Sequence, residues 1–243
     1  MKIKISYILF LFWLLSCTSE TISTDTLQDV ITANVHLQQD EVIACAASKQ
    51  NDNQTTYVFY YPIPNTTNIQ YFETESVHVD KNDFSKYKKV SLEKEAVFNG
   101  YLERFVRNNT KEVWCVVTYH SEGKFHKSNP ILLKHQSKPT EWTDKLAIDF
   151  SEPLSPKFTW EDGTVKENAI YFQVVADATS NLLSGTYTYQ KSFQYYNLSN
   201  VVLNITRTPP PSLLKNQDYI FTMMGVSEDN WVNLVIQKNF EAK

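Results

Sequence analysis

The residues that could carry out chemistry are few, and they do not cluster along the chain. The five histidines are His36, His78, His120, His126 and His135. A zinc site needs three or four converging ligands, and no carboxylate or cysteine partner is identifiable for the pair at 120 and 126. We interpret that pair as surface residues flanking a turn, and we expect no metal. The one Ser-x-x-Lys string, at residues 121–124, lies on the same turn, whereas the serine enzymes that use it place it at a helix start.

Other catalytic signatures are missing from the sequence. The chain contains no Gly-x-Ser-x-Gly, His-Glu-x-x-His or Cys-x-x-Cys string. Its five glycines are isolated from one another, so no loop is expected to cradle a phosphate or a nucleotide cofactor. We predict a non-catalytic protein without a cofactor. The alternative is a small envelope hydrolase with an unrecognised site, because the paired carboxylates of glycoside hydrolases are spaced in three dimensions and no string reveals them.

The composition indicates a packed, acidic protein. Hydrophobic residues make up 42% of the 243 residues and aromatic residues 14%, which is too much for a disordered chain and predicts extensive buried cores. The formal net charge is −4. Nucleic acid is therefore not expected as a partner, because binding to phosphates needs a basic surface.

The first sixteen residues indicate an export signal. Lys2 and Lys4 precede an apolar run, residues 5–15, that is too short to span a bilayer as a mature helix. The run ends in Leu14-Leu15-Ser16-Cys17, which resembles the lipobox of bacterial lipoproteins. This resemblance implies that residues 1–16 are removed and that Cys17 becomes a lipidated first residue. Acyl chains such as palmitate would then hold the protein on a membrane of the cell envelope, where we expect the outer membrane. The alternative is an ordinary secretory signal.

Residues 17–40 are expected to form the lipidated cysteine and a flexible tether. Residues 18–34 are rich in Thr, Ser and Asp and show no lasting apolar period. Thr26, within Asp25-Thr26-Leu27, resembles the short acceptor motif for O-glycosylation in Bacteroidetes. The alternative is a plain linker.

From residue 41 onward the pattern is that of β-strands. Apolar and polar residues alternate, and turn residues interrupt them at short intervals. The strands expected in the first half are Glu41–Ala47, Thr56–Tyr61, Ile69–Thr74, Tyr87–Leu92, Val97–Phe105, Glu112–Tyr119 and Phe125–Lys134. Those expected in the second half are Lys157–Trp160, Ala169–Val175, a hairpin that turns at Gly185, Asn200–Thr206, Tyr219–Met224 and Trp231–Phe240. We predict an all-β protein of two tandem antiparallel β-sandwiches, residues 41–136 and 146–243, joined by a linker at 137–145.

The second half resembles the fibronectin type III family at specific residues. Trp160 precedes a strand with the pattern Ala169-x-Tyr171, and Leu213 lies six residues before Tyr219, as in the tyrosine corner of that fold. The first half matches its closing hairpin through Trp114-x-Val116-x-Thr118 and a turn at Gly123. The resemblance implies a fibronectin type III-like or immunoglobulin-like sandwich, and it implies no activity.

Five aromatic residues are candidates for contact with a ligand. Trp142 lies in the linker, where it either packs between the domains and fixes their relative angle or meets a ligand. The pairs Tyr60-Tyr61 and Tyr195-Tyr196 are candidates because adjacent strand residues point to opposite faces. Exposed tyrosines without function, or strands covered on both faces, are the alternative for these pairs.

Two cysteines remain besides Cys17. Cys45 and Cys115 belong to an exported chain, where disulfides can persist, so they are candidates for a bridge. Both lie in apolar runs, where a free cysteine would serve equally well as a small core residue. The sequence therefore predicts an envelope lipoprotein that is anchored through Cys17 and acts as a binding or assembly module for an unknown protein or glycan.

Overall fold

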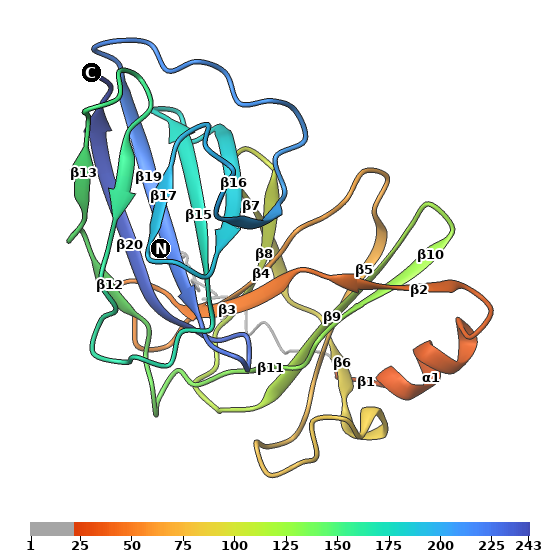
Figure 1. Ribbon diagram of the computed structural model, residues 1–243. Coiled ribbons are helices and arrows are strands. Elements are labelled where there is room, and N and C mark those ends of the chain that lie inside the picture. Colours follow the sequence, from red (N-terminus) through yellow and green to blue (C-terminus); the bar gives the residue numbers. More distant parts are fainter. Residues whose placement is uncertain (1–21) are drawn as a thin grey trace, which may run out of the picture.

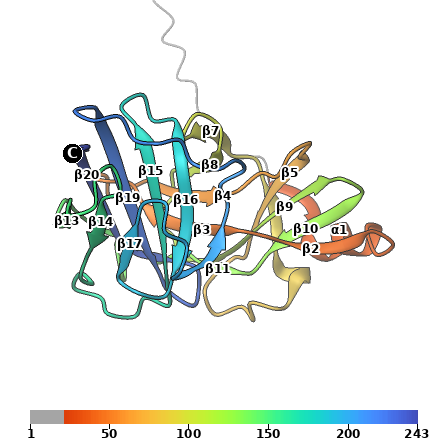
Figure 2. The ribbon, with the colours of Figure 1, turned by 45° about the horizontal axis from the view of Figure 1, so that its top comes forward.

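The protein is a nearly all-β molecule in which two sandwiches pack against each other (Figures 1 and 2). The computed structural model describes residues 22–243. The sheets of the first sandwich use residues 22–132, and those of the second use residues 141–241. The prediction of an all-β fold with tandem sandwiches is confirmed. No helix among the described residues is long and apolar enough to cross a membrane.

The first sandwich consists of a four-stranded and a seven-stranded sheet. The four-stranded sheet has the order β3 (Ala44–Ser48), β4 (Thr56–Tyr60), β8 (Leu102–Arg107), β7 (Glu93–Val97). The larger sheet has the order β1 (Ile22–Thr26), β6 (Lys88–Val90), β5 (Thr67–Glu73), β9 (Trp114–Ser121), β10 (Lys124–Ser128), β2 (Gln38–Val42), and β11 (Ile131–Leu132) pairs with β9. A 3-10 turn, η1 (Phe84–Lys86), precedes β6. In chain order the two sheets correspond to strands ABED and GFCC′ of an immunoglobulin-like sandwich.

The second sandwich repeats this plan with a smaller first sheet. Its three-stranded sheet has the order β13 (Ala147–Asp149), β14 (Lys157–Thr159), β17 (Ser192–Gln194). Its six-stranded sheet has the order β12 (Glu141–Thr143), β20 (Val232–Glu241), β19 (Asp218–Val226), β15 (Ile170–Asp177), β16 (Leu182–Thr188), β18 (Val201–Asn204). Phe158 stacks on Phe221 between the sheets, with ring centroids 4.0 Å apart.

The tyrosine corner expected in the second sandwich is present. The hydroxyl of Tyr219 accepts a hydrogen bond from the backbone N–H of Leu214 at 2.9 Å, and Leu213 is buried beside it. The bond ties the loop before β19 to the start of that strand.

A third hydrophobic core lies between the two sandwiches. Tyr57 and Phe59 on β4 pack there with residues of the six-stranded sheet, among them Phe172, Val174 and Met224. The neighbours Val58 and Tyr60 on the same strand point into the core of the first sandwich. Because successive strand residues face opposite sides, β4 is buried throughout, and the second sandwich covers its outer face.

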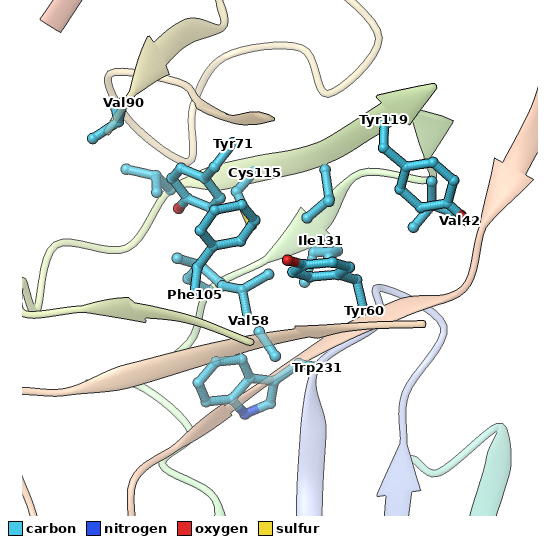
Figure 3. Close-up of a cluster of buried hydrophobic side chains, with 14 residues drawn as sticks. Val42, Val58, Tyr60, Tyr71, Val90, Phe105, Cys115, Tyr119, Ile131 and Trp231 are labelled. Atoms are coloured by element: carbon cyan, nitrogen blue, oxygen red, sulfur yellow. The ribbon is translucent and has the colours of Figure 1, made fainter. Parts of the chain in front are cut away.

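The first sandwich also receives a side chain from the second. Trp231, directly before β20, is fully buried in the core of the first sandwich, where its indole lies below Val58 and Tyr60 (Figure 3). The other residues of that core all come from positions 42–133.

The described part of the expected tether, residues 22–40, is folded, so that prediction is wrong for these residues. They form β1, helix α1 (Leu27–Ala33) and the start of β2. Thr26 and Asp29 form a capping box at the helix start, and Leu27 is fully buried against Tyr87 and Val116. The helix has only two turns, so its apolar spacing is too brief to register as a period in the sequence.

Three expected strands and turns also differ in the structure. The segment 41–47 divides at Ile43 between β2 and β3, which belong to different sheets. The segment 97–105 contains the β7–β8 turn, where Phe98, Asn99 and Gly100 have positive φ. Gly185 lies inside β16 and not at a hairpin turn. A Cβ there would come within 2.9 Å of an Ile205 side-chain carbon, so glycine allows that close approach.

Candidate functional site: a cleft at the joint of the two sandwiches

A cleft lies where the linker passes the β3–β4 turn. Its volume is about 890 Å³. One wall is the turn at residues 49–54, and the other is the linker with Trp142. Five carboxamide side chains line it: Gln50, Asn51, Asn53, Gln54 and Gln136.

The first wall is held by local hydrogen bonds of Asp52. Its carboxylate accepts from the backbone N–H of Gln54 at 2.8 Å and of Thr55 at 3.0 Å. These bonds, that of Gln54 first, lower the pKa of Asp52 to about 2. Asn51 has a φ of 55°, a left-handed conformation that asparagine tolerates better than most residues. The hydrogen bonds of Asp52 therefore hold the backbone of this turn in one conformation, and the amide side chains of the turn are exposed around the ionised carboxylate.

The second wall is attached to the first sandwich through Ser48. Thr140 accepts a hydrogen bond from the Ser48 backbone N–H at 2.8 Å and donates one to the carbonyl of Val232 at 2.8 Å. The indole N–H of Trp142 donates to the Ser48 carbonyl at 3.1 Å, and Nδ1 of His135 lies 2.9 Å from the Ser48 hydroxyl. The linker is thus held to both sandwiches.

Trp142 combines the two roles considered for it. It pairs with Val235 in the parallel ladder between β12 and β20, so the expected linker contains a strand. Its side chain is half-buried against the interdomain core, and it also lines the cleft. Because its N–H is bound to Ser48, the position of the ring is fixed before any ligand arrives.

The charges of the lysine and the aspartate that line the cleft cancel each other. Lys49 and Asp52 form an ion pair at 3.2 Å, and the carboxamides around them are neutral. Such a surface offers many hydrogen-bond donors and acceptors together with one aromatic ring.

The contact between Ser48 and His135 is the one serine–histidine pair at the cleft, and it does not resemble a catalytic dyad. Ser48 is only 3% exposed, and its hydroxyl also accepts from the Thr140 N–H at 3.3 Å. Within residues 22–243 no carboxylate is hydrogen-bonded to His135 to orient it. No group of three metal-ligating side chains occurs in this part of the chain either.

Most of the aromatic candidates from the sequence are packing residues. Tyr60 is buried and donates to Glu103, and Tyr195 is buried and donates to the Pro211 carbonyl at 2.7 Å. Tyr61 is half-buried at the joint. Of the four tyrosines only Tyr196 is exposed, at 43%, with its ring edge against Tyr195.

Arg207, which sequence reasoning missed, holds the joint at Tyr61. Its Nε donates to the Tyr61 hydroxyl at 3.2 Å, and its Nη2 donates to the Pro62 carbonyl at 2.9 Å. The guanidinium also lies 4.6 Å from the ring centroid of Tyr101. A lone arginine beside a proline-rich loop gave no signal of this role in the sequence.

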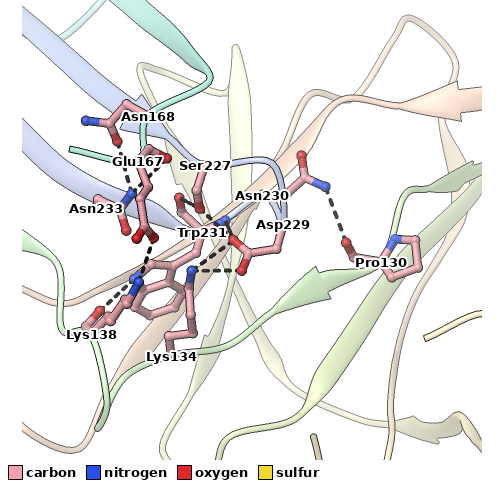
Figure 4. Close-up of polar contacts among 10 residues, drawn as sticks. All are labelled: Pro130, Lys134, Lys138, Glu167, Asn168, Ser227, Asp229, Asn230, Trp231 and Asn233. Carbon is pink, nitrogen blue, oxygen red and sulfur yellow. Dashed lines mark hydrogen bonds and ion pairs between the residues drawn. The ribbon is translucent and has the colours of Figure 1, made fainter. Parts of the chain in front are cut away.

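The β19–β20 turn forms a second contact that the sequence did not predict (Figure 4). Asp229 accepts from Lys134 Nζ at 2.8 Å, and the Trp231 indole N–H donates to the Lys138 carbonyl at 2.8 Å. The backbone N–H of Ala46 donates to the Asn230 carbonyl at 3.0 Å. The turn therefore extends the edge of β3 and closes the first sandwich.

The remaining predicted residues lie away from the cleft. Cys17 lies outside the described residues. The Thr26 hydroxyl is engaged with the Asp29 carboxylate at 2.7 Å as the helix cap. Cys45 and Cys115 are free thiols in two different cores, so the structure does not form the disulfide that the sequence left open.

The two histidines expected on the surface are not a surface pair. His126 is only 2% exposed and packs on the ring of Tyr119, with centroids 4.8 Å apart. His120 is half-buried, and its Nε2 lies 2.8 Å from the Asn34 side-chain oxygen. The described N-terminal residues cover this hairpin, which the expectation of a flexible tether did not allow for.

Comparison with known proteins adds little to this geometry. No protein-family model and no curated protein matches the chain. Among solved structures, it is similar to the FN1–FN3 domains of chicken CNTN1, with 11% identity over 84% of this chain and 68% of that one, at a TM-score of 0.29. It is also similar to a two-domain fibronectin type III segment of chicken tenascin, with 11% identity over 84% of this chain and 98% of that one, at a TM-score of 0.25.

A third similar structure is that of the receptor tyrosine kinase Torso. Its identity is 10% over 86% of this chain and 76% of that one, at a TM-score of 0.25. Likenesses this distant carry no argument about function. The sandwich assignment rests on the strand order and the tyrosine corner described above.

Proposed function

We propose that the protein is a non-catalytic binding module of the bacterial cell envelope, anchored by lipid on Cys17, and that its ligand is a glycan held in the cleft beside Trp142. The observation that carries the proposal is the cleft wall itself, a fixed indole among five carboxamides with no net charge. Sugars present C–H faces that stack on aromatic rings and hydroxyls that pair with amides. A neutral polyhydroxylated ligand fits this surface better than a charged peptide does.

The anchor is supported by the sequence alone, through the apolar run and the residues Leu14-Leu15-Ser16-Cys17. Replacing Cys17 by serine should release the protein from membranes without unfolding it, because a thiol is needed for lipidation. Cys45→Ser serves as the control, since this residue lies in the interdomain core. Sedimentation of the Cys17→Ser variant with membranes would contradict the anchor and leave the cleft proposal standing.

The ligand is tested by screening the purified protein on a glycan array and measuring affinity for any hit by calorimetry. The double variant Gln54→Ala/Gln136→Ala removes two amides from opposite walls and should weaken binding at least about tenfold, which corresponds to about 1.4 kcal/mol. Gln217→Ala is the matched control, because this exposed carboxamide lies outside the cleft. Background signal across the array, or equal loss in the control, would overturn the glycan assignment.

A further inference from the structure

His135 lines the cleft with a side chain that is almost entirely buried. It is only 7% exposed, and its Nδ1 lies 2.9 Å from the Ser48 hydroxyl. No hydrogen bond joins its Nε2 to any of residues 22–243. His126 shows the alternative for such an atom, because both of its ring nitrogens are buried without a partner. Nε2 of His135 is not buried in that way, so solvent reaches it, and the cleft is the open space that this side chain lines.

The partners of Ser48 decide which ring nitrogen of His135 carries the hydrogen. The Ser48 hydroxyl oxygen accepts from the Thr140 N–H at 3.3 Å, so its own hydrogen needs an acceptor. Ser48 is 3% exposed, and within the described chain Nδ1 of His135 is the one acceptor that its hydroxyl contacts. The hydroxyl therefore donates to Nδ1. A neutral imidazole that accepts at Nδ1 carries its hydrogen on Nε2, so His135 presents an N–H donor to the cleft.

Ser48 also orients the indole that lines the same cleft. Its carbonyl accepts from the Trp142 N–H at 3.1 Å, and its backbone N–H donates to Thr140 at 2.8 Å. One residue thus holds both the imidazole and the indole. Because both rings are held before a ligand arrives, binding costs little side-chain entropy there. The arrangement suits a ligand whose apolar face lies on the indole while one of its oxygen atoms accepts from Nε2 of His135.

We propose that His135 is a specificity-determining residue of the cleft, donating from Nε2 to a hydroxyl or carbonyl oxygen of the ligand, and that Ser48 positions it by fixing the tautomer. The proposal rests on the glycan cleft proposed above, and it adds a directional demand to that surface. A carboxamide offers both a donor and an acceptor, whereas this imidazole nitrogen offers only a donor. A ligand with an ammonium group at this place would leave two donors facing each other, so we expect it to be rejected.

NMR spectra of the imidazole nitrogens test the tautomer without a ligand. They are recorded on Cys17→Ser protein, so that lipid plays no part, at about pH 8, where an imidazole is ordinarily neutral. The hydrogen of His135 should lie on Nε2. Ser48→Ala keeps the backbone bonds of Ser48 and should allow the tautomer with its hydrogen on Nδ1 to appear. A hydrogen on Nδ1 in the parent protein, or an unchanged tautomer in Ser48→Ala, would overturn the positioning role of Ser48.

Two replacements of His135 test its contact with the glycan that gives the strongest signal on the array. The side-chain oxygen of His135→Asn can still accept from Ser48, but this variant has no donor at the position of Nε2. His135→Gln places an amide nitrogen near that position instead. In calorimetry His135→Asn should weaken binding about fivefold, as expected for one neutral hydrogen bond, and His135→Gln should retain most of the affinity. Monodeoxy analogues of the same glycan test the contact in the parent protein, where the analogue that lacks the accepting oxygen should bind about fivefold more weakly.

The outcomes separate this proposal from the cleft itself. Binding that Gln54→Ala/Gln136→Ala weakens and His135→Asn leaves unchanged would overturn the role of His135 and keep the cleft. Equal losses in His135→Asn and His135→Gln, with full affinity for every monodeoxy analogue in the parent protein, would also overturn it. A blank array would overturn the glycan assignment and this proposal together.

Discussion

The two sandwiches differ in where their core residues come from. The core of the second sandwich uses only its own residues, from Phe158 to Ala242. The core of the first sandwich is completed by Trp231 from the second, and its outer sheet face is covered by the six-stranded sheet. The second sandwich therefore fills the space between its own sheets without a side chain from the first, while the first needs one from the second. The cleft lies at this joint, so its shape depends on the same contacts.

Trp231→Ala should have the largest effect on stability. It opens a cavity in the core of the first sandwich and removes the hydrogen bond to the Lys138 carbonyl. We expect a loss of about 3 to 5 kcal/mol in the free energy of unfolding. Denaturant titration followed by tryptophan fluorescence and by circular dichroism measures it. A loss below about 1 kcal/mol would show that the first sandwich does not need this side chain.

Arg107→Ala should lower the free energy of unfolding nearly as much, and the loss should arise in the first sandwich, where Arg107 lies. Arg107 is 1% exposed and forms an ion pair with Glu73 at 2.7 Å, while Tyr71 donates to the same carboxylate at 2.8 Å. Removing the arginine leaves a half-buried carboxylate without its cation, which typically costs about 3 kcal/mol or more. Replacing both Arg107 and Glu73 by apolar residues should restore part of the loss in the same titration. No recovery in the double variant would contradict the ion-pair account.

Tyr219→Phe should have a smaller effect that stays in the second sandwich. It removes only the bond from the Leu214 N–H and leaves the ring in place. We expect a loss of about 1 kcal/mol. Faster amide exchange confined to the loop before β19 would agree with this, and faster exchange in the first sandwich would contradict the expectation that the effect stays in the second.

Asp52→Asn should have the smallest effect and should change the pH dependence of the β3–β4 turn. Hydrogen bonds lower the pKa of Asp52 to about 2 in the folded protein from 3.8, so its stabilisation is present above pH 3.8 and is lost as pH falls towards 2. Amide exchange of Gln54 and Thr55, compared between pH 5 and pH 2.5, should rise in the parent protein beyond the intrinsic change. In Asp52→Asn this extra rise should disappear, and an identical rise in both proteins would contradict it.

The sandwiches could be predicted from sequence because their signals are local. Period-two runs and the spacing of Leu213 and Tyr219 depend on residues that are close along the chain. The joint could not be predicted in the same way. The residues around Trp231 in the sequence do not indicate in which of the two cores its side chain is buried. Its contact residues Ala46 and Lys138 are more than ninety positions away along the chain.

One feature of the sequence does indicate that the two sandwiches pack against each other. β4 reads Thr-Tyr-Val-Phe-Tyr, which is apolar or aromatic on both faces from Tyr57 onward. A strand of this kind is expected to be covered on both sides, whereas a sandwich of its own covers only one. The cleft residues gave no comparable signal, because Gln50, Asn53 and Gln136 are ordinary turn and linker residues until the fold brings them together.

Hydrogen exchange on the full chain with Trp231→Ala tests the dependence of the first sandwich on the second most directly. The account predicts that protection falls throughout β4 and β9 in the first sandwich, while β14 and the centre of β19 stay protected. Equal loss of protection in both sandwiches, or loss confined to the second, would contradict it.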